Sequence, residues 1–478
     1  MIPESIKIHR PKGTEVRLFK GTYYVYKITS VWDKEKKKAK KKTLGCIGKI
    51  LPDEGFIPSK KTVIPSIEKV VVKEYGCSQL FIQLNDELFD KLKEYFSSLY
   101  REIFTLAIIR LMNKTNNSTI KRYYDTSYLS EEFKELRLSE NRITEFMRDL
   151  GERREQMRGF MQEFIPKGEV LLFDGTCIFS DSKESTYAKQ GYNPRGKKNG
   201  QINLLYAFAK SDHIPVYYRL LPGNITDKAA FMNTVKESGI ENCIIIGDNG
   251  FYSKSNTSFL DEQQLSYILP LRTDTKYVDD SFKALSDKEK FEDCFVYHDR
   301  VIWFTKVPIG DNRKQVYIFR DDGMKRYSEL SFMRKKDAEY EGYTLDRFYD
   351  KQNSYGMHYL YSNIETEPQD IYLSYKARWE IEECFDYLKN GLDLGTVYQR
   401  NNEKMESWAF LNHISLMLFY SLHRKLLETG LSRKYCVEEI IGLAKTISKV
   451  QVNDDWYVSE MSKPDKDLFS AIGVNLYT

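Results

Sequence analysis

The stretch VLLFD, residues 170–174, consists of four consecutive apolar residues followed by a carboxylate. A short, continuous apolar run of this kind predicts a central β-strand that is covered on both faces. A second run, CIII at residues 243–246, is followed by Gly247 and Asp248 and predicts another buried strand. Reacting groups collect where the strands of open α/β sheets end, so we expect Asp174 and Asp248 to lie at a ligand-binding edge.

The segments around these two runs alternate between strand and helix patterns. Strands are predicted at 202–209, 216–221 and 267–271, and helices at 227–237 and 253–264, with Thr226 as the N-cap of the first helix. Three strands, a helix, a strand, a helix and a strand predict an α/β fold with a mixed sheet. Shorter strand patterns at 295–297, 301–304 and 316–319 indicate a β-rich insertion over residues 272–365.

A third candidate carboxylate lies on a helix predicted for residues 370–390. Tyr375, Arg378, Glu382 and Lys389 have offsets of 0, 3, 7 and 14 residues. At about 100° per residue they lie on one stripe about 60° wide. Asp386 is the only other acid on that face of the predicted helix. We therefore select Glu382 as the partner of the two aspartates.

Structural explanations without a function exist for parts of this set. A strand-end aspartate can be a helix N-cap or an ion-pair partner. Arg378 and Glu382 are spaced i,i+4, so they can form an exposed ion pair that contributes only a few tenths of a kcal/mol. That explanation does not account for Tyr375 and Lys389 on the same stripe. We interpret Asp174, Asp248 and Glu382 as a catalytic carboxylate triad.

The motifs Asp174-Gly175-Thr176, Asp248-Asn249-Gly250-Phe251 and Tyr375-x2-Arg378-x3-Glu382-x6-Lys389 resemble those of the DDE transposases of bacterial insertion sequences, in particular the insertion-sequence-four group. The resemblance implies an RNase H-like catalytic core, interrupted by a β-rich insertion between the second Asp and the Glu. It also implies cut-and-paste transposition, with DNA cleavage and strand transfer at terminal inverted repeats. Many relatives have an acid or a Ser/Thr after the first Asp, whereas this chain has Gly175, which is not expected to be a ligand.

The chemistry of that family requires divalent metal ions and positive charge. Phosphodiester cleavage builds negative charge on the phosphate oxygens, and two metal ions about 3.5–4 Å apart can stabilise the attacking and leaving oxygens. We expect the triad to hold two Mg²⁺ (or Mn²⁺) ions, because these cations prefer carboxylate oxygens. Arg378 and Lys389 would neutralise the phosphate, and Tyr375 would hydrogen-bond one of its oxygens.

The N-terminal part of the chain is basic. Residues 1–60 contain 15 Lys and Arg against 6 Asp and Glu, a net charge of +9, although the whole chain carries only +4. The alternation over residues 21–50 predicts a β-hairpin whose lysine-rich turn, residues 33–42, cannot pack in a core. The turn is either solvated or lies against phosphates. In the second interpretation Lys37 and Lys41 contact DNA.

We expect five parts along the chain. Residues 1–75 form the basic hairpin module, and 76–166 form a helical region expected to bind DNA ends, although a plain helical bundle is the commoner outcome of such a pattern. Residues 167–271 and 366–450 form the catalytic core, 272–365 the insertion and 451–478 a C-terminal tail. Trp303, in the insertion, is a candidate to stack on a base swung out of a DNA hairpin; a buried strand Trp is the alternative.

Nothing in the sequence predicts a membrane or secreted protein. The most apolar stretch, residues 410–422, contains Asn412 and His413 and predicts a buried helix rather than a membrane span. The N-terminus lacks the apolar segment of a signal peptide. The seven Cys contain no CxxC pair and fit a reducing compartment. We expect a cytoplasmic protein that acts at the bacterial nucleoid.

Two other functions fit parts of the pattern. A DNA-binding descendant that has lost catalysis is disfavoured by the complete set of Asp174, Asp248 and Glu382. An RNase H-like nuclease acting on RNA–DNA hybrids leaves the basic hairpin and the insertion without a role. The transposase hypothesis predicts, as partners, double-stranded DNA with terminal inverted repeats and target DNA. By resemblance, the protein is expected to be a homodimer in the synaptic complex.

Overall fold

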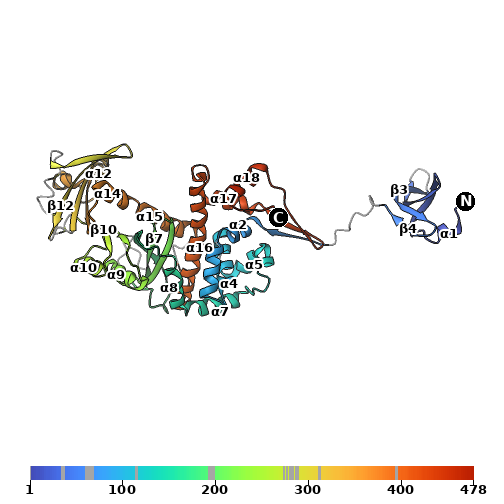
Figure 1. The fold of residues 1–478 in the computed structure, drawn as a ribbon, viewed down its shortest axis with the longest axis horizontal. Helices are drawn as coiled ribbons and strands as arrows, with labels where there is room; N and C mark the ends of the chain where they lie inside the picture. The colour runs from blue at the N-terminus through green and yellow to red at the C-terminus, as the bar shows by residue number, and fades with distance from the viewer. Residues whose placement is uncertain are drawn as a thin grey trace. The chain divides into compact units, whose positions relative to one another are not determined.

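The computed structural model describes residues 2–33, 38–59, 69–113, 117–191, 200–272, 275, 278, 285, 290–310, 314–392 and 397–477 (Figure 1). The chain divides into two compact units, Met1–Val71 with Gln451–Tyr457, and Val72–Val450 with Val458–Thr478. No helix within the described ranges combines the length and the apolar content needed to cross a membrane.

The first unit is built on one antiparallel sheet in the order β1-β2-β3-β4. Its elements are α1 (Glu4–Lys7), β1 (Thr14–Phe19), β2 (Thr22–Asp33), β3 (Lys38–Leu51) and β4 (Gly55–Pro58). Strands β2 and β3 form the hairpin predicted for residues 21–50, which is confirmed. The predicted turn over residues 33–42 is too long, because residues 38–42 belong to β3 and pair with residues 29–33 of β2. The unit has a small core of its own, made by Ile6, Val16, Val25 and Ile50.

Helices form the part of the second unit that the periodicity predicts as helical. They are α2 (Gly76–Leu84), α3 (Asp86–Tyr95), α4 (Tyr100–Met112), α5 (Asn117–Thr126), α6 (Leu129–Glu132), α7 (Glu140–Gly151) and α8 (Arg154–Gln162). The long helix α16 (Asn402–Glu428) contains the apolar stretch 410–422, and Asn412 and His413 are buried in it as expected. It packs against α4, α7 and β8, and so connects the helical region to the sheet (Figure 1).

The second unit is organised around a nine-stranded mixed sheet in the order β11-β12-β13-β14-β10-β9-β6-β7-β8. The predicted strands and helices are confirmed as β6 (Val170–Phe179), β7 (Gln201–Ala209), β8 (Ile214–Pro222), α9 (Asp227–Ser238), β9 (Ile244–Ile246), α10 (Lys254–Glu262) and β10 (Ser266–Pro270). Strand β6 is antiparallel to β7 and parallel to β9. Thr226 is the N-cap residue of α9, but its side chain makes no capping hydrogen bond.

The segment 272–365 differs from the expectation in two respects. Its strands β11 (Asp293–Tyr297), β12 (Arg300–Ile309), β13 (Lys314–Asp321) and β14 (Met357–Ser362) do not form a separate sheet, because β14 pairs with β10 and continues the sheet of the core. It also contains α12 (Asp322–Asp337) and α13 (Leu345–Lys351). Helix α12 buries only Phe332 among its described residues, so no apolar stripe marks it in the sequence.

Residues 451–478 are more ordered than the expected tail. Strand β15 (Ser448–Val452) lies between β16 (Asp455–Val458) and β5 (Val70–Glu74) in a three-stranded sheet. Helix α17 (Val437–Lys445) precedes it, and α18 (Lys463–Ala471) follows it. Leu468 and Phe469 of α18 are buried in the main core, which explains why this segment is held.

Candidate active site

Asp174 and Asp248 lie at the same level on neighbouring strands. Strands β6 and β9 are parallel, and their last pair joins Leu172 to Ile246. Continued by two residues, this register sets Asp174 opposite Asp248. The prediction that Asp174 directly follows its strand is wrong, because β6 continues beside β7 to Phe179. The neighbouring strand β9 has already ended at the level of Asp174. Asp174 therefore lies at the edge of the sheet where reacting groups collect.

The helix that carries Glu382 is interrupted. Helix α14 (Pro368–Lys376) and α15 (Trp379–Asp386) are separated by two residues, and Tyr387–Gly391 is a π-helix. One uninterrupted helix over 370–390 was therefore the wrong expectation. The turn is tighter at Arg378, whose backbone N–H donates to the Tyr375 carbonyl three residues earlier at 3.1 Å. Arg378 keeps helical dihedral angles, φ −55° and ψ −21°, so Glu382 stays on its side of the helix.

Packing fixes α15 on the face of the sheet near Asp174. The helix contacts β6. The ring of Phe385 lies edge-on to Tyr206 of β7, with ring centres 6.0 Å apart. Ile381, Cys384 and Phe385 are buried, and this apolar side holds the helix in place. From the same helix, Glu382 reaches Arg378, which also lies near the two aspartates.

Arg378 joins all three candidate carboxylates. Its Nη1 lies 3.7 Å from Asp174 Oδ2 and 3.7 Å from Asp248 Oδ1, and its Nη2 donates to Glu382 Oε1 at 2.6 Å. The side chains of Arg378 and Asp174 are only 18% and 16% exposed, whereas Asp248 and Glu382 are 44% and 42% exposed. The site is therefore a half-buried cluster of three acids around one guanidinium, open to solvent on the Asp248 and Glu382 side.

The electrostatics of the site act clearly on Asp174. Burial, with smaller contributions from the charges of Asp248 and Glu382, raises the pKa of Asp174 to about 6 against the lowering effects of Arg378 and the Gly175 N–H. Its Oδ1 accepts a hydrogen bond from the Gly175 N–H at 2.9 Å. Asp174 lies close to two other acids and therefore favours a nearby cation, because the cation removes the repulsion among the three acids.

The donor set fits a hard divalent cation. Three carboxylates provide the oxygen ligands that Mg²⁺ and Mn²⁺ prefer. In the described part of the chain, no three His, Cys, Asp or Glu side chains are arranged to hold a metal ion as they stand. The guanidinium of Arg378 takes the place on which the three carboxylates converge. A cation bound by Asp174, Asp248 and Glu382 would therefore compete with Arg378 for the same oxygens.

The structure describes the other predicted site residues to different extents. Tyr375, at the end of α14, is half-buried, and burial together with the charges of the cluster raises its pKa. Lys389 lies in the π-helical segment, but its side chain is outside the described residues, as is the whole of Lys37. Lys41 is half-exposed and pairs with Glu15 at 2.7 Å.

Trp303 is not brought to the triad. It lies on β12, and its indole N–H donates to Asp322 Oδ2 at 3.3 Å while the ring packs partly buried against the core. Strands β13, β14 and β10 lie between β12 and β9. Four strand spacings of about 4.8 Å put the two strands about 19 Å apart. This geometry favours the structural explanation of Trp303.

Asp227 was missed as a neighbour of the triad. It is the first residue of α9, and burial and the charge of Asp248 raise its pKa, whereas Arg272 lowers it. Its Oδ2 lies 3.2 Å from the position that a Cβ on Gly250 would take, in the loop after Asp248. In the sequence, an acid at a helix N-terminus is fully explained by the helix dipole. Only the fold shows that Asp227 faces the Asp248 loop.

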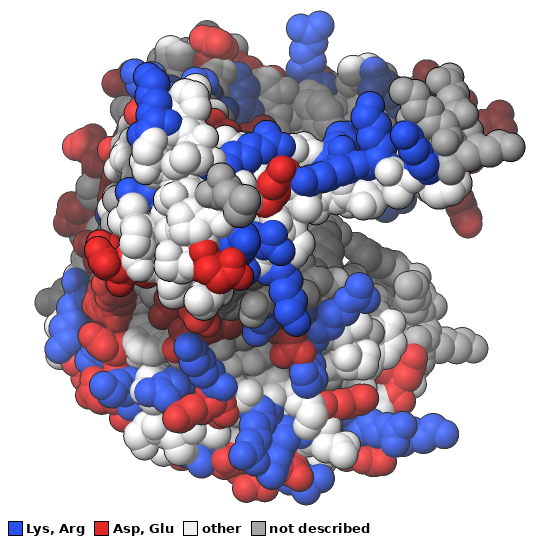
Figure 2. All heavy atoms as spheres, turned by 90° about the vertical axis from the view of Figure 1, so that its right-hand side faces the viewer, with Lys and Arg blue, Asp and Glu red and all other residues white. Residues whose placement is uncertain are grey.

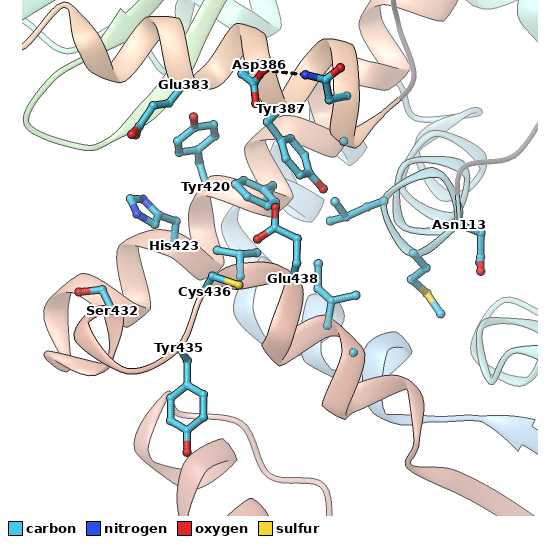
Figure 3. A pocket seen from close by; sticks show the side chains of 18 of the residues that line it. Asn113, Glu383, Asp386, Tyr387, Tyr420, His423, Ser432, Tyr435, Cys436 and Glu438 are labelled. Atoms are coloured by element: carbon cyan, nitrogen blue, oxygen red, sulfur yellow. Dashed lines mark hydrogen bonds between the residues drawn. The ribbon is translucent and has the colours of Figure 1, made fainter.

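An open pocket of about 1350 Å³ is lined by Glu382 and by other residues of α15. Figure 3 shows side chains from α15, α16 and the start of α17 around it, including Glu383, Tyr420 and Glu438. Asp386, the rival acid of the sequence, lines this pocket and accepts a hydrogen bond from Asn390 Nδ2 at 2.6 Å. Glu382 lines the same pocket, but of these three α15 acids it is the one whose carboxylate contacts Arg378.

Comparison with known proteins gives one family match and several distant structural likenesses. A family model described as a transposase DDE domain matches residues 165–418, more than half of the chain. No curated protein matches. Among solved structures, a piggyBac transposase synaptic complex with hairpin DNA is similar at 12% identity and a TM-score of 0.40, over 78% of this chain and 79% of that one. A Mos1 transposase paired-end complex with the left transposon end is similar at 14% identity and a TM-score of 0.15, over 32% and 58%.

Proposed function

The chain belongs to the family of transposases with a DDE domain, and we propose that it cuts DNA at the terminal inverted repeats of an insertion sequence and transfers the freed strands to target DNA. The observation that carries this proposal is the convergence of Asp174, Asp248 and Glu382 on Arg378. All four residues lie inside the matched range 165–418. The spacing from Tyr375 through Arg378 and Glu382 to Lys389 supports membership of the insertion-sequence-four group.

The topology supports an RNase H-like catalytic core. Strands β6, β7 and β8 follow one another as an antiparallel meander, and β9 and β10 then add in parallel on the other side of β6. Helices α9 and α10 provide the two crossovers. Residues 272–365 enter between Asp248 and Glu382 in the sequence, as expected for the insertion. We propose residues 1–75 and 76–166 as the DNA-binding parts.

Each site residue has a role that its position supports. Asp174, Asp248 and Glu382 would hold two Mg²⁺ or Mn²⁺ ions through carboxylate oxygens. When bound, such ions activate a water and stabilise charge on the attacking and leaving oxygens. Arg378, released from the carboxylates, would bind the phosphate at the cleaved bond through two N–H groups. Tyr375 would donate to a phosphate oxygen, and Lys389 would add positive charge.

The proposed partners are double-stranded DNA with terminal inverted repeats and a target duplex, bound by a homodimer in the synaptic complex. The reaction is cut-and-paste. Two alternatives make different predictions. A descendant that has lost catalysis binds the ends without cutting them. An RNase H-like nuclease cuts an RNA–DNA hybrid in preference to the duplex ends.

The test is a cleavage assay with duplexes that carry the DNA flanking the gene, with Mg²⁺ or Mn²⁺. We expect the natural chain to cut at the element end, and Asp174→Ala, Asp248→Ala and Glu382→Gln to lose at least about 100-fold in rate, since even residues that only support metal ligands cost up to about that much. The matched control is Glu383→Gln, on the same helix, whose carboxylate accepts from the Trp379 indole at 2.7 Å.

Three results would decide against the proposal. Equal cleavage by the natural chain and Asp174→Ala means that the triad does not catalyse. Binding of the ends without cleavage under either metal favours the lapsed descendant. Preferential cutting of an RNA–DNA hybrid of the same sequence favours the nuclease. Loss of activity in Glu383→Gln equal to that in Glu382→Gln would remove the specific assignment of Glu382.

A further inference from the structure

The flanking strands β1 and β4 do not accompany the N-terminal hairpin of β2 and β3 along its full length. Strand β1 pairs with β2 only as far as Lys27, and β4 pairs with β3 only from Gly48 onward. Between these limits, residues 28–33 pair with residues 38–43, and in the described part of the chain no third strand pairs with either segment. The Ile28 N–H also donates to the Gly13 carbonyl at 3.1 Å, at the base of this part. We call residues 28–33 and 38–43 the basic ribbon. An isolated two-stranded ribbon is marginally stable in water, so this one is suited to a partner that covers it.

The basic ribbon has no core of its own. Residues 38–43 are all exposed, and the small core of the first unit lies at the base of the hairpin around Val25 and Ile50. The two register shifts in the hairpin, next to Val25 and Lys27, also lie at the base. Beyond them the pairing is regular from Ile28 to the end of β2. Successive side chains in this part therefore alternate regularly between the two faces of the ribbon.

The lysines are sorted between the faces. Residues opposite each other on paired strands share a face, and neighbours along a strand alternate. Lys38, Lys40 and Lys42 consequently lie on one face, and Trp32, which pairs with Ala39, lies on the other with Lys41. Trp32 is 63% exposed. The ribbon thus presents a row of cations on one face and a large aromatic side chain on the other.

The row of three lysines is available for a ligand. Within the described part of the chain, no carboxylate pairs with Lys38, Lys40 or Lys42, whereas Lys41 on the opposite face is already held by Glu15 at 2.7 Å. The basic ribbon contains four Lys and one acid, Asp33, which pairs with Lys38 in the strand register at the end of the lysine row. Figure 2 shows several Lys and Arg side chains next to one another at its upper right, and Lys and Arg mixed with Asp and Glu in its lower part. The net charge of the chain does not indicate where a polyanion would bind, whereas the row of lysines on the ribbon does.

We propose that the basic ribbon inserts into a groove of duplex DNA, with Lys38, Lys40 and Lys42 on the phosphates and Trp32 against the groove wall. A major groove about 12 Å wide admits a two-stranded ribbon, whose strands are about 4.8 Å apart. Lysine ammonium groups release counterions from phosphates without reading sequence. This inference rests on the proposed function for its choice of polyanion, and it assigns the contact to one face rather than to the lysine run as a whole.

The test compares two triple variants of the full chain on a mixed-sequence duplex, without divalent metal. One is Lys38→Gln/Lys40→Gln/Lys42→Gln. The control, Lys12→Gln/Lys20→Gln/Lys27→Gln, removes the same charge from exposed lysines of the first unit outside the basic ribbon. Because each phosphate contact contributes about 0.9 to the slope of log K against log salt, we expect the ribbon variant to lose about 2.7 from the slope and the control to change it by less than about 1.

Trp32 provides a second readout that does not depend on charge. The difference in fluorescence between the natural chain and Trp32→Phe isolates Trp32 from the other four Trp, and we expect this difference signal to change on addition of duplex. Equal slopes for both triple variants, or a Trp32 signal that does not respond, would overturn the proposal. So would tighter binding of single-stranded RNA or anionic vesicles than of duplex. If end cleavage that depends on Asp174 persists in that case, only the ribbon assignment fails and the proposed function stands.

Discussion

Arg378 is the cation that contacts all three acids of the site. It lies between Asp174 and Asp248 and also contacts Glu382, so it provides the positive charge that three neighbouring acids require. Such a residue competes with any cation that the same oxygens bind. It is also the group best placed to pass to a phosphate once it is released, because a guanidinium can bind carboxylate and phosphate in the same two-pronged way.

The residue-scale prediction is that Arg378→Ala binds Mn²⁺ more tightly than the natural chain while binding transposon ends more weakly. We expect a gain of about tenfold in metal affinity at pH 8, since an ion pair at about 4 Å is worth up to a few kcal/mol at an effective dielectric constant of about 20. Mn²⁺ titration followed by electron paramagnetic resonance measures it without turnover. Arg378→Lys serves as control, because it keeps the charge; weaker Mn²⁺ binding in Arg378→Ala would contradict the competition.

At the scale of elements, the site depends on how close the helices approach one another. Helix α7 ends at Gly151, where a Cβ would lie 1.9 Å from the carbonyl oxygen of Glu403 at the start of α16. Helix α16 in turn packs on β8 of the sheet. The absence of a side chain at Gly151 therefore lets α7 and α16 meet, and this contact supports the position of the catalytic sheet.

We predict that Gly151→Ala destabilises the second unit by about 1–3 kcal/mol, the usual cost of forcing an extra carbon into a packed interface. The matched control is Gly442→Ala in α17, where nothing lies within 4 Å of the new Cβ. There the better helix propensity of Ala should stabilise by about 0.5–1 kcal/mol. Urea unfolding of the two variants measures the opposite signs, and a neutral Gly151→Ala would show that the two helices can separate without cost.

At the scale of the whole molecule, a buried ion network connects the helical region to the catalytic core. Arg154 of α8 pairs with Glu237 of α9 at 2.7 Å and lies 3.7 Å from Glu406 of α16. Arg219 of β8 also pairs with Glu237 at 3.0 Å, and the Tyr187 hydroxyl donates to Glu406 at 2.7 Å. Charged residues of α8, β8, α9 and α16 and the hydroxyl of Tyr187 therefore form one network.

The prediction at this scale is that Arg154→Met destabilises the second unit by about 3–5 kcal/mol, because it leaves the buried Glu406 without its nearest cation. Glu406→Gln in the same chain should restore part of the loss. The neighbouring Arg153 forms an exposed pair with Asp149 at 2.8 Å, so Arg153→Met should cost at most about 1 kcal/mol. Thermal unfolding of the three variants makes the comparison; equal losses in Arg153→Met and Arg154→Met would mean that the network does not support the fold.

Local sequence patterns predict most elements of the core. They fail where the structure of a segment depends on residues that are distant in the sequence. The apolar runs at 170–173 and 243–246 identify β6 and β9, since a strand covered on both faces needs continuous apolar side chains. Helix α12 has no comparable stripe, and the tighter turn at Arg378 leaves no mark in the helical period. Asp227 had an adequate local explanation, so its approach to the Asp248 loop was not visible in the sequence.

By itself, the sequence determined the strands that carry Asp174 and Asp248, the helical stripe that selects Glu382, and the basic hairpin, because each depends on side chains that are close along the chain. Only the tertiary structure decided that the β6–β9 register sets the two aspartates level, that Arg378 lies among three acids, and that Trp303 is several strands away. Register and helix placement come from the simultaneous packing of distant segments, and no local pattern contains that information.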